Sequence, residues 1–171
     1  MADRVVGRSD WHPSSTHLAA VKRFPWARLI VAKPTTFVND SGDAVVDLLD
    51  RFSIELEEIL VVTDDVHLDL GRLRLRRGGS DGGHNGLRSI IATTGRRDFA
   101  RLRFGIGQPS SRSSMIEHVL GRFQPSERET VDRALGRAVE TVIGFARDGI
   151  ERAMNQANLK DDTSSSGDAG T

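Results

Sequence analysis

Two carboxamides and one carboxylate stand in this sequence where they could act on a bound substrate. Asn39 lies in PTTFVNDSG, Asn85 lies in GGHNG, and Asp64 follows the apolar run ILVV. A carboxylate in such a place can orient a histidine, bind a metal ion or cap the next turn. A carboxamide can hold a substrate carbonyl, or it can cap the start of a helix. The residue types alone leave these alternatives open.

The segment around Asn85 is rich in glycine. Five of the nine residues in GGSDGGHNG, at 78–86, are glycines. Glycine at this density costs conformational entropy, and a folded chain keeps it mainly where φ is positive or another molecule approaches closely. The segment has neither the GxxxxGK[ST] pattern of a P-loop nor a GxGxxG pattern. We therefore expect a substrate-binding surface here, which includes Gly83 and His84.

The charge is unevenly distributed along the chain. The formal net charge is zero, but residues 72–103 contain nine arginines and two aspartates, a local excess of seven positive charges. Such a segment is typical of a protein that contacts a polyanion, because phosphate contacts supply most nonspecific affinity for nucleic acid. A solvated, arginine-rich surface explains the same composition equally well.

Length and composition limit the class of protein. A chain of 171 residues can bury a core as one domain without disulfides. It contains no cysteine, which excludes disulfides and thiolate metal sites and fits a reducing cytoplasm. No apolar run approaches the ~20 residues of a membrane span, and MADRVVGR has no signal-peptide core. We expect a cytoplasmic protein with no metal, no cofactor and no membrane partner.

The hydrophobic periodicity of the first half predicts strands and a helix. THLAAVK and RLIVAK predict two strands joined by a turn at 23–27. A helix with Ser41 as its N-cap is predicted next, from an apolar stripe at helical spacing. The run ILVV at 59–62 predicts a strand buried on both faces, with Asp64 just past its carboxyl end. We expect Asp65 to be a solvated turn residue.

The second half continues the alternation. RLRLRR at 72–77 and the strand at 101–106 each place arginines on one face, and Arg101 and Arg103 are expected to point outward. GLRSIIATTG predicts a helix that ends at Gly95. Together these elements predict an α/β domain over residues 1–160, with helices on both faces of the sheet.

The end of the chain divides into a helix and a tail. Ser126 and Glu129 predict a capping box that starts a long amphipathic helix toward Gly149. The tail DDTSSSGDAGT, at 161–171, has nothing to bury and is expected to be disordered.

In combination, the segments FVNDSG, VVTDDVHLDLGRLRLRRGGSDGGHNGLRSI, RLRFGIG and VLGRFQPSE resemble the bacterial peptidyl-tRNA hydrolase family. The resemblance covers residues 33–155. It implies a three-layer α/β domain with a mixed, twisted sheet. It also implies a monomer that acts in translation, where it hydrolyses the ester between the peptide and the 3′ ribose of tRNA without metal or cofactor.

The resemblance implies roles for the residues that could carry out the chemistry. In the family a histidine acts as general base on water and an aspartate orients it, and Asp64 matches that aspartate. Asn39 and Asn85 match asparagines that hold the peptide end and the attacking water. Phe37 matches a neighbouring substrate contact.

The resemblance also implies contacts with the nucleic acid. Arg76 and Arg103 match basic side chains that bind the tRNA phosphates. Gly83 and His84 belong to the family's glycine loop, where the peptide and the 3′ end of tRNA would pass. His84 is expected to be structural or to contact tRNA rather than to replace the general base.

One part of the family pattern has no counterpart in the sequence. The amino-terminal strand, the GLGNPG loop and the TRHN segment with the catalytic histidine are missing, so we expect the true start codon to lie upstream. Loss of a general base typically costs a factor of about 10² to 10⁴ in rate, which predicts weak hydrolysis from the chain as given. The alternatives are a noncatalytic RNA-binding protein on the same scaffold and a fragment that does not fold alone.

Overall fold

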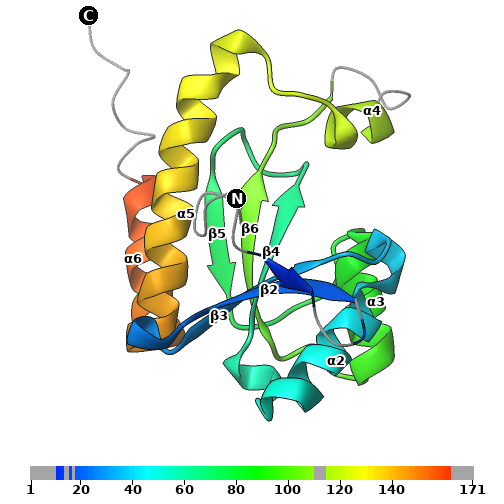
Figure 1. Ribbon diagram of the computed structural model, residues 1–171. Coiled ribbons are helices and arrows are strands. Elements are labelled where there is room, and N and C mark those ends of the chain that lie inside the picture. Colours follow the sequence, from blue (N-terminus) through cyan, green and yellow to red (C-terminus); the bar gives the residue numbers. More distant parts are fainter. Residues whose placement is uncertain (1–10, 14–15, 17, 110–114, 163–171) are drawn as a thin grey trace, which may run out of the picture. The chain divides into compact units, whose positions relative to one another are not determined.

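The computed structural model describes residues 11–13, 16, 18–109 and 115–162 (Figure 1). Its contacts divide the chain into two compact units, one of Met1–Leu60 with Arg77–Ala100 and one of Val61–Arg76 with Arg101–Thr171. The elements confirm the α/β class, with a mixed sheet and helices. Most of the predicted tail, residues 163–171, lies outside the described residues.

The first unit contains the predicted hairpin. Its strands form an antiparallel sheet in the order β1 (His12–Pro13), β2 (Ala19–Phe24) and β3 (Leu29–Pro34). The turn between β2 and β3 is a short 3₁₀ helix, η1 (Pro25–Ala27), which starts with proline because proline already has the φ value required there. The prediction of two strands joined by a turn is confirmed.

Two helices of the first unit pack against each other. They are α2 (Ser41–Phe52) and α3 (Asn85–Thr94), and the backbone N–H of Gly42 donates to Ser89 Oγ at 2.9 Å. The prediction that Ser41 caps α2 is wrong. Asp40 takes the N-cap position without a side-chain hydrogen bond, and Ser41 is the first residue of the helix, with its hydroxyl donating to the Val38 carbonyl at 2.8 Å. The predicted end of α3 at Gly95, which has φ of 69°, is confirmed.

Close packing of α2 on α3 depends on Gly42. A Cβ at this position would contact the Thr93 side chain and would lie 2.7 Å from the Ser89 carbonyl oxygen. We expect Gly42→Ala to lower the free energy of unfolding by about 1–3 kcal/mol, because the backbone of α3 must move. Chemical denaturation measures this change.

Gly136→Ala is the matched control for Gly42→Ala. Gly136 is exposed within α5 (Arg128–Asp148), and a Cβ there meets no other atom within 4 Å. The control should stabilise the protein by ~0.5–1 kcal/mol, because alanine loses less backbone entropy in a helix. Equal effects of the two substitutions would show that the α2–α3 packing is not as described.

The second unit holds a sheet in the order β4-β6-β5, formed by β4 (Leu60–Asp65), β5 (Leu73–Arg76) and β6 (Ala100–Gly105); Leu60 and Ala100 are assigned to the first unit. β5 and β6 are antiparallel, and Arg74 lies opposite Arg103. The predicted alternation is confirmed by the buried apolar residues of the two strands, namely Leu73, Leu75, Leu102 and Phe104.

Two predictions about burial in this sheet are wrong. Arg101 was expected to point outward, but only 1% of it is exposed. Almost all of β6 is buried, whereas alternation assigns a residue only to a face and does not say whether that face is covered. β4 was expected to be buried on both faces, but Val62 is 39% exposed, and the strand continues through Asp64 to Asp65.

The second unit also contains the helices α4 (Met115–Leu120), α5 and α6 (Ile150–Asp162) and the short 3₁₀ helix η5 (Pro125–Glu127). Another short 3₁₀ helix, η3 (Leu56–Glu58), belongs to the first unit. The predicted capping box of Ser126 and Glu129 is wrong by two residues. Gln124 and Glu127 form it, with the Gln124 N–H donating to Glu127 Oε2 at 2.7 Å. The predicted helix end at Gly149 is confirmed.

One side chain of helix α6 forms hydrogen bonds with the outer edge of the sheet. Asn158 Oδ1 accepts from the backbone N–H of Leu75 at 3.2 Å, and Asn158 Nδ2 donates to the Leu75 carbonyl at 3.3 Å. The carboxamide therefore satisfies both backbone groups of a residue on the edge strand β5.

Candidate active site

The structure brings Asn39 and Asn85 onto neighbouring elements of the first unit. Asn39 lies in the 3₁₀ helix η2 (Val38–Asp40), which packs against the start of α3, where Asn85 is the first residue. Val38 Cγ2 lies 3.2 Å from the point where Gly86 would carry a Cβ, so a larger residue than glycine would push the two elements apart. Residues separated by 46 positions in the sequence thus share one surface.

The side chains on this surface are directed to solvent. Phe37 is 81% exposed, and Asn39 and Asn85 are exposed as well. Asn39 Nδ2 donates to Asp40 Oδ1 at 3.1 Å. This local hydrogen bond agrees with the structural alternative for Asn39, yet it uses only one of the four hydrogen bonds that a carboxamide can make.

The glycine loop is ordered by Asp81. Asp81 Oδ1 accepts from the Gly83 N–H at 2.8 Å, and the Asp81 carbonyl accepts from the His84 N–H at 3.1 Å. The hydrogen bond from Gly83 lowers the pKa of the Asp81 carboxyl. Gly82 and Gly83 have φ of 59° and 84°, which other residues adopt only with strain. The expectation of positive φ in this loop is confirmed.

His84 has a structural role in this loop. Its Nδ1 accepts a hydrogen bond from the backbone N–H of Leu87 at 3.2 Å, so His84 is the N-cap of α3. An accepting Nδ1 carries no proton, which places the proton of the neutral ring on Nε2. The cap also fixes the backbone of Asn85, the residue that follows.

Asp64 belongs to the second unit, as do Arg76 and Arg103. It is half-buried, as the fifth residue of β4. The next residue, Asp65, was expected to be solvated, and this prediction is wrong. Asp65 is only 8% exposed, and its Oδ2 accepts a hydrogen bond from Arg103 Nη1 at 3.1 Å.

The Asp65–Arg103 ion pair is a feature that the sequence prediction missed. Asp65 Oδ1 also accepts from the His67 N–H at 2.9 Å, so both carboxylate oxygens have partners. The side chains of Asp65 and Arg103 are 7% and 20% exposed. No pattern in the sequence reveals the pair, because it depends on the order of the strands in the sheet.

The arginines of β5 and β6 share one face of the sheet. Arg74 and Arg76 on β5 lie opposite Arg103 and Arg101 on β6, and residues directly opposite each other project from the same face. Arg74 and Arg76 are exposed. The predicted phosphate-binding residues Arg76 and Arg103 therefore lie on the same face of adjacent strands.

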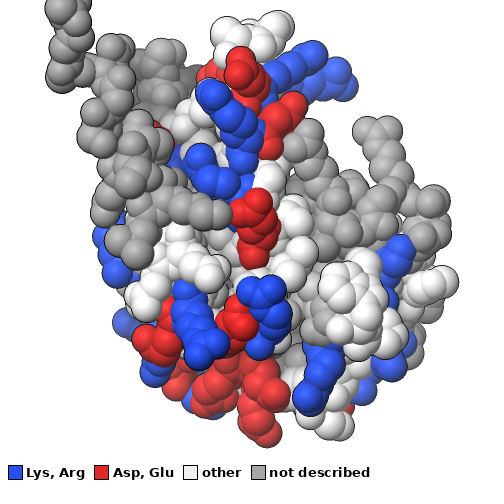
Figure 2. Space-filling view, turned by 90° about the vertical axis from the view of Figure 1, so that its left-hand side faces the viewer, with Lys and Arg blue, Asp and Glu red and all other residues white. Residues whose placement is uncertain are grey.

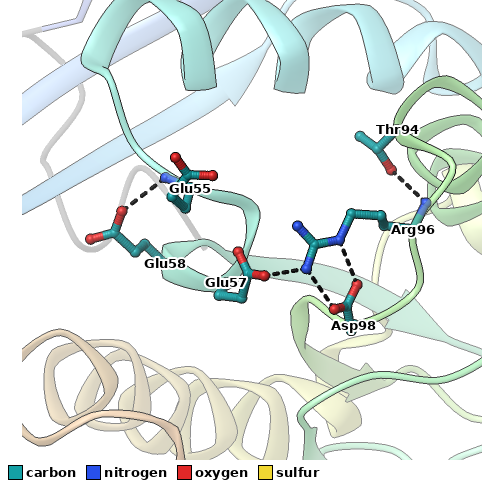
Figure 3. A network of polar contacts seen from close by, with 6 residues as sticks. All are labelled: Glu55, Glu57, Glu58, Thr94, Arg96 and Asp98. Carbon is teal, nitrogen blue, oxygen red and sulfur yellow. Dashed lines mark hydrogen bonds and ion pairs between the residues drawn. The ribbon is translucent and has the colours of Figure 1, made fainter.

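A separate polar network lies just after the end of α3, in the first unit (Figure 3). Arg96 Nε and Nη2 donate to the Asp98 carboxylate at 2.9 Å and 2.6 Å, and Arg96 also pairs with Glu57. These contacts lower the pKa of Asp98 and of Glu57 and raise the pKa of Arg96.

An open hollow of about 590 Å³ lies beside this network. It is lined by Arg77, Gly78, Gly79, Gly95, Arg96, Arg97 and Asp98. None of the predicted site residues lines it, so we do not assign it as the active site.

Basic and acidic side chains are interspersed on the face of the molecule that Figure 2 shows, among the residues coloured there. On α5, Arg133 pairs with Glu129 at 3.5 Å, and Arg147 pairs with Asp148 at 2.7 Å. This face therefore gives no support for a uniformly basic surface.

Two other kinds of feature are absent from the described residues. No group of three or more His, Asp or Glu side chains there could hold a metal ion. In the same part of the chain, no helix has the length and apolar character of a membrane span.

Comparisons with known proteins agree with the predicted family. The family model described as "Peptidyl-tRNA hydrolase" matches residues 1–166. A peptidyl-tRNA hydrolase of Caldanaerobacter subterraneus subsp. tengcongensis is 45% identical over 135 residues, which cover 79% of this chain and 72% of the relative. One of Chlorobium phaeobacteroides is 48% identical over 132 residues, with 77% and 70% covered.

A solved structure extends the similarity to the fold. The crystal structure of peptidyl-tRNA hydrolase from Acinetobacter baumannii superposes with a TM-score of 0.79 at 30% sequence identity. The match covers 92% of this chain and 82% of that one.

Proposed function

Because this chain belongs to the peptidyl-tRNA hydrolase family, we propose that it hydrolyses the ester between peptide and tRNA and releases both. The observation that carries the proposal is the match of residues 1–166 to the family model. The close approach of η2 and α3, which brings Asn39 near Asn85, supports it. No observation favours the noncatalytic RNA-binding alternative.

We propose that Asn39 and Asn85 hold the peptide end of the substrate and the attacking water. Their exposure on neighbouring elements supports this role, because a substrate can reach both carboxamides at once. Phe37, exposed beside Asn39, would contact the peptide, and Gly83 would let the substrate approach the backbone. His84 would act indirectly, by capping α3 and so placing Asn85.

We propose that Asp64 orients the general base, and that Arg76 and Arg103 bind tRNA phosphates. The shared face of β5 and β6 supports a phosphate site made by two arginines. The general base of the family is a histidine. Two of the described histidines, His84 and His118, use a ring nitrogen for a structural hydrogen bond. His84 Nδ1 accepts from the Leu87 N–H, and His118 Nε2 contacts the Ile106 and Gly107 carbonyls. This supports the proposal that neither is the base.

Release of labelled peptide from peptidyl-tRNA tests the proposal. We expect the chain to release peptide, and Asn85→Ala to lower kcat/KM by about 10²-fold, because a misplaced water or ester reacts that much more slowly. Asn155→Ala is the matched control, since Asn155 is an exposed asparagine on α6. A chain that binds tRNA and releases no peptide, or an Asn85 variant as fast as the control, would overturn the proposal.

We further propose that residues 1–160 work as one domain, as a monomer in the cytoplasm, without metal or cofactor. The family match across residues 1–166 supports the domain, and the absence of cysteine from the sequence supports the compartment. Sedimentation of the purified chain measures the oligomeric state.

A further inference from the structure

An exposed aromatic side chain marks the turn of the β2–β3 hairpin, in the first unit. Trp26, in η1, is 77% exposed. A tryptophan in this state forgoes the burial that normally stabilises it, and its exposed ring offers a flat face on which a nucleotide base can stack. The turn precedes β3 and Phe37 follows it, so six strand residues, roughly 20 Å, separate the turn from the proposed active site.

Local contacts hold Trp26 in place without covering it. The rings of Phe24 and Trp26 meet edge to face, with centroids 6.2 Å apart and planes at 83°. Pro25 starts η1, and the Arg28 N–H closes it by donating to the Pro25 carbonyl at 3.2 Å. An aromatic side chain with few rotatable bonds, held by a neighbouring ring, loses little entropy when a ligand stacks on it.

The segment of the sequence that contains Trp26 is cationic. Residues 11–39 contain two lysines and two arginines and no aspartate or glutamate; the four are Lys22, Arg23, Arg28 and Lys33. Lys22 Nζ lies 5.7 Å from the centre of the Phe24 ring, and Arg23 Cζ lies 4.7 Å from that of Phe52. The charges therefore lie close to the aromatic rings of the hairpin and of α2.

This combination matches the chemistry of unpaired nucleotides. A base stacks on an exposed aromatic face, and the phosphates on either side of it are attracted to neighbouring cations. An apolar protein partner would instead need a continuous apolar patch, but Lys22, Arg23 and Arg28 interrupt the apolar residues here.

We propose that the hairpin tip, defined by Lys22, Phe24, Trp26 and Arg28, is an RNA-binding site at which an unpaired base stacks on Trp26. It is separate from the residues proposed to cleave the ester. The proposal rests on the proposed function only for the identity of the RNA, which is the tRNA part of the substrate.

The tryptophan content of the chain allows a direct test. The sequence contains two tryptophans, so Trp11→Phe leaves Trp26 as the only indole. We expect the fluorescence of Trp11→Phe to be quenched in a saturable way by deacylated tRNA and by a short oligouridylate. The midpoint should move to higher RNA concentration as salt increases, because counterions are released on binding.

Affinity measurements on variants complete the test. Anisotropy of labelled oligouridylate should show about 5- to 100-fold weaker binding by Trp26→Ala, the range that stacking of one base supplies, and little loss in Trp26→Phe. Leu120→Ala is the matched control, because Leu120 is 80% exposed on α4.

Two outcomes would overturn the inference about the hairpin tip. One is unchanged Trp26 fluorescence or unchanged Trp26→Ala affinity while RNA binds. The other is a change in Trp26 fluorescence with protein concentration alone, which would make a second copy of the chain the occupant. None of these measurements needs turnover. A protein that binds RNA through Trp26 and cleaves no ester would refute the proposed function and leave this inference intact.

Discussion

Asp64→Asn is expected to lower kcat for peptidyl-tRNA cleavage by about 10²- to 10⁴-fold, while the protein remains folded. The amide keeps the size of the side chain and removes the charge that orients and stabilises a protonated base. Asp64 is half-buried in β4, so its side chain is already held in one region of the sheet. Single-turnover peptide release measures the chemical step.

The pH profile separates this role from a purely structural one. A carboxylate near a histidine raises the pKa of the imidazole, and its removal lowers that pKa. With a histidine as the base, as proposed from the family, the neutral imidazole accepts the proton, so the acid limb of kcat should move to lower pH in Asp64→Asn. Asp69→Asn is the matched control, since Asp69 is exposed in the segment that follows β4. An unshifted acid limb in Asp64→Asn would contradict the assignment of Asp64.

Of the substitutions considered for stability, Asp65→Asn should produce the largest loss, about 2–4 kcal/mol in the free energy of unfolding. The substitution leaves the Arg103 guanidinium, 20% exposed, without the carboxylate that accepts its hydrogen bond. For a chain of this length, that loss lowers Tm by about 5–15 °C. Thermal and chemical denaturation both measure the effect, again with Asp69→Asn as the control.

A double variant distinguishes the ion pair from other causes of instability. Asp65→Asn with Arg103→Met removes the guanidinium as well and should recover part of the stability lost in Asp65→Asn. If the two substitutions are additive, the 3.1 Å contact contributes little and the loss has another origin.

The alternating strands, the hairpin and the ends of two helices could be predicted from the sequence, because each depends on a short-range pattern. Period-two spacing placed the leucines of β5 inward, and Gly95 ended α3. The burial of Arg101 could not be predicted, because alternation assigns a side chain to a face but does not reveal what covers that face. The start of α2 and the position of the capping box were wrong by one or two residues, because neighbouring polar side chains compete for the same backbone groups.

The candidate site was predicted in part. Asn39 and Asn85 were named from the sequence, but only the fold shows that η2 and α3 bring them together. The role of Asp65 was missed, because its burial depends on Arg103, 38 residues away. Residue types can suggest chemistry, whereas the pairing of distant charges depends on strand order, which no local pattern specifies.

The carboxamide of Asn158 covers part of an exposed strand edge, which affects the tendency of the protein to aggregate at high concentration. β5 is an edge strand, and a free edge can recruit a strand from another molecule and seed aggregates. At Leu75 the position such a strand would take is filled by an amide that imitates a peptide unit. Helix α6 thus blocks this position on β5 against the addition of a strand from another molecule.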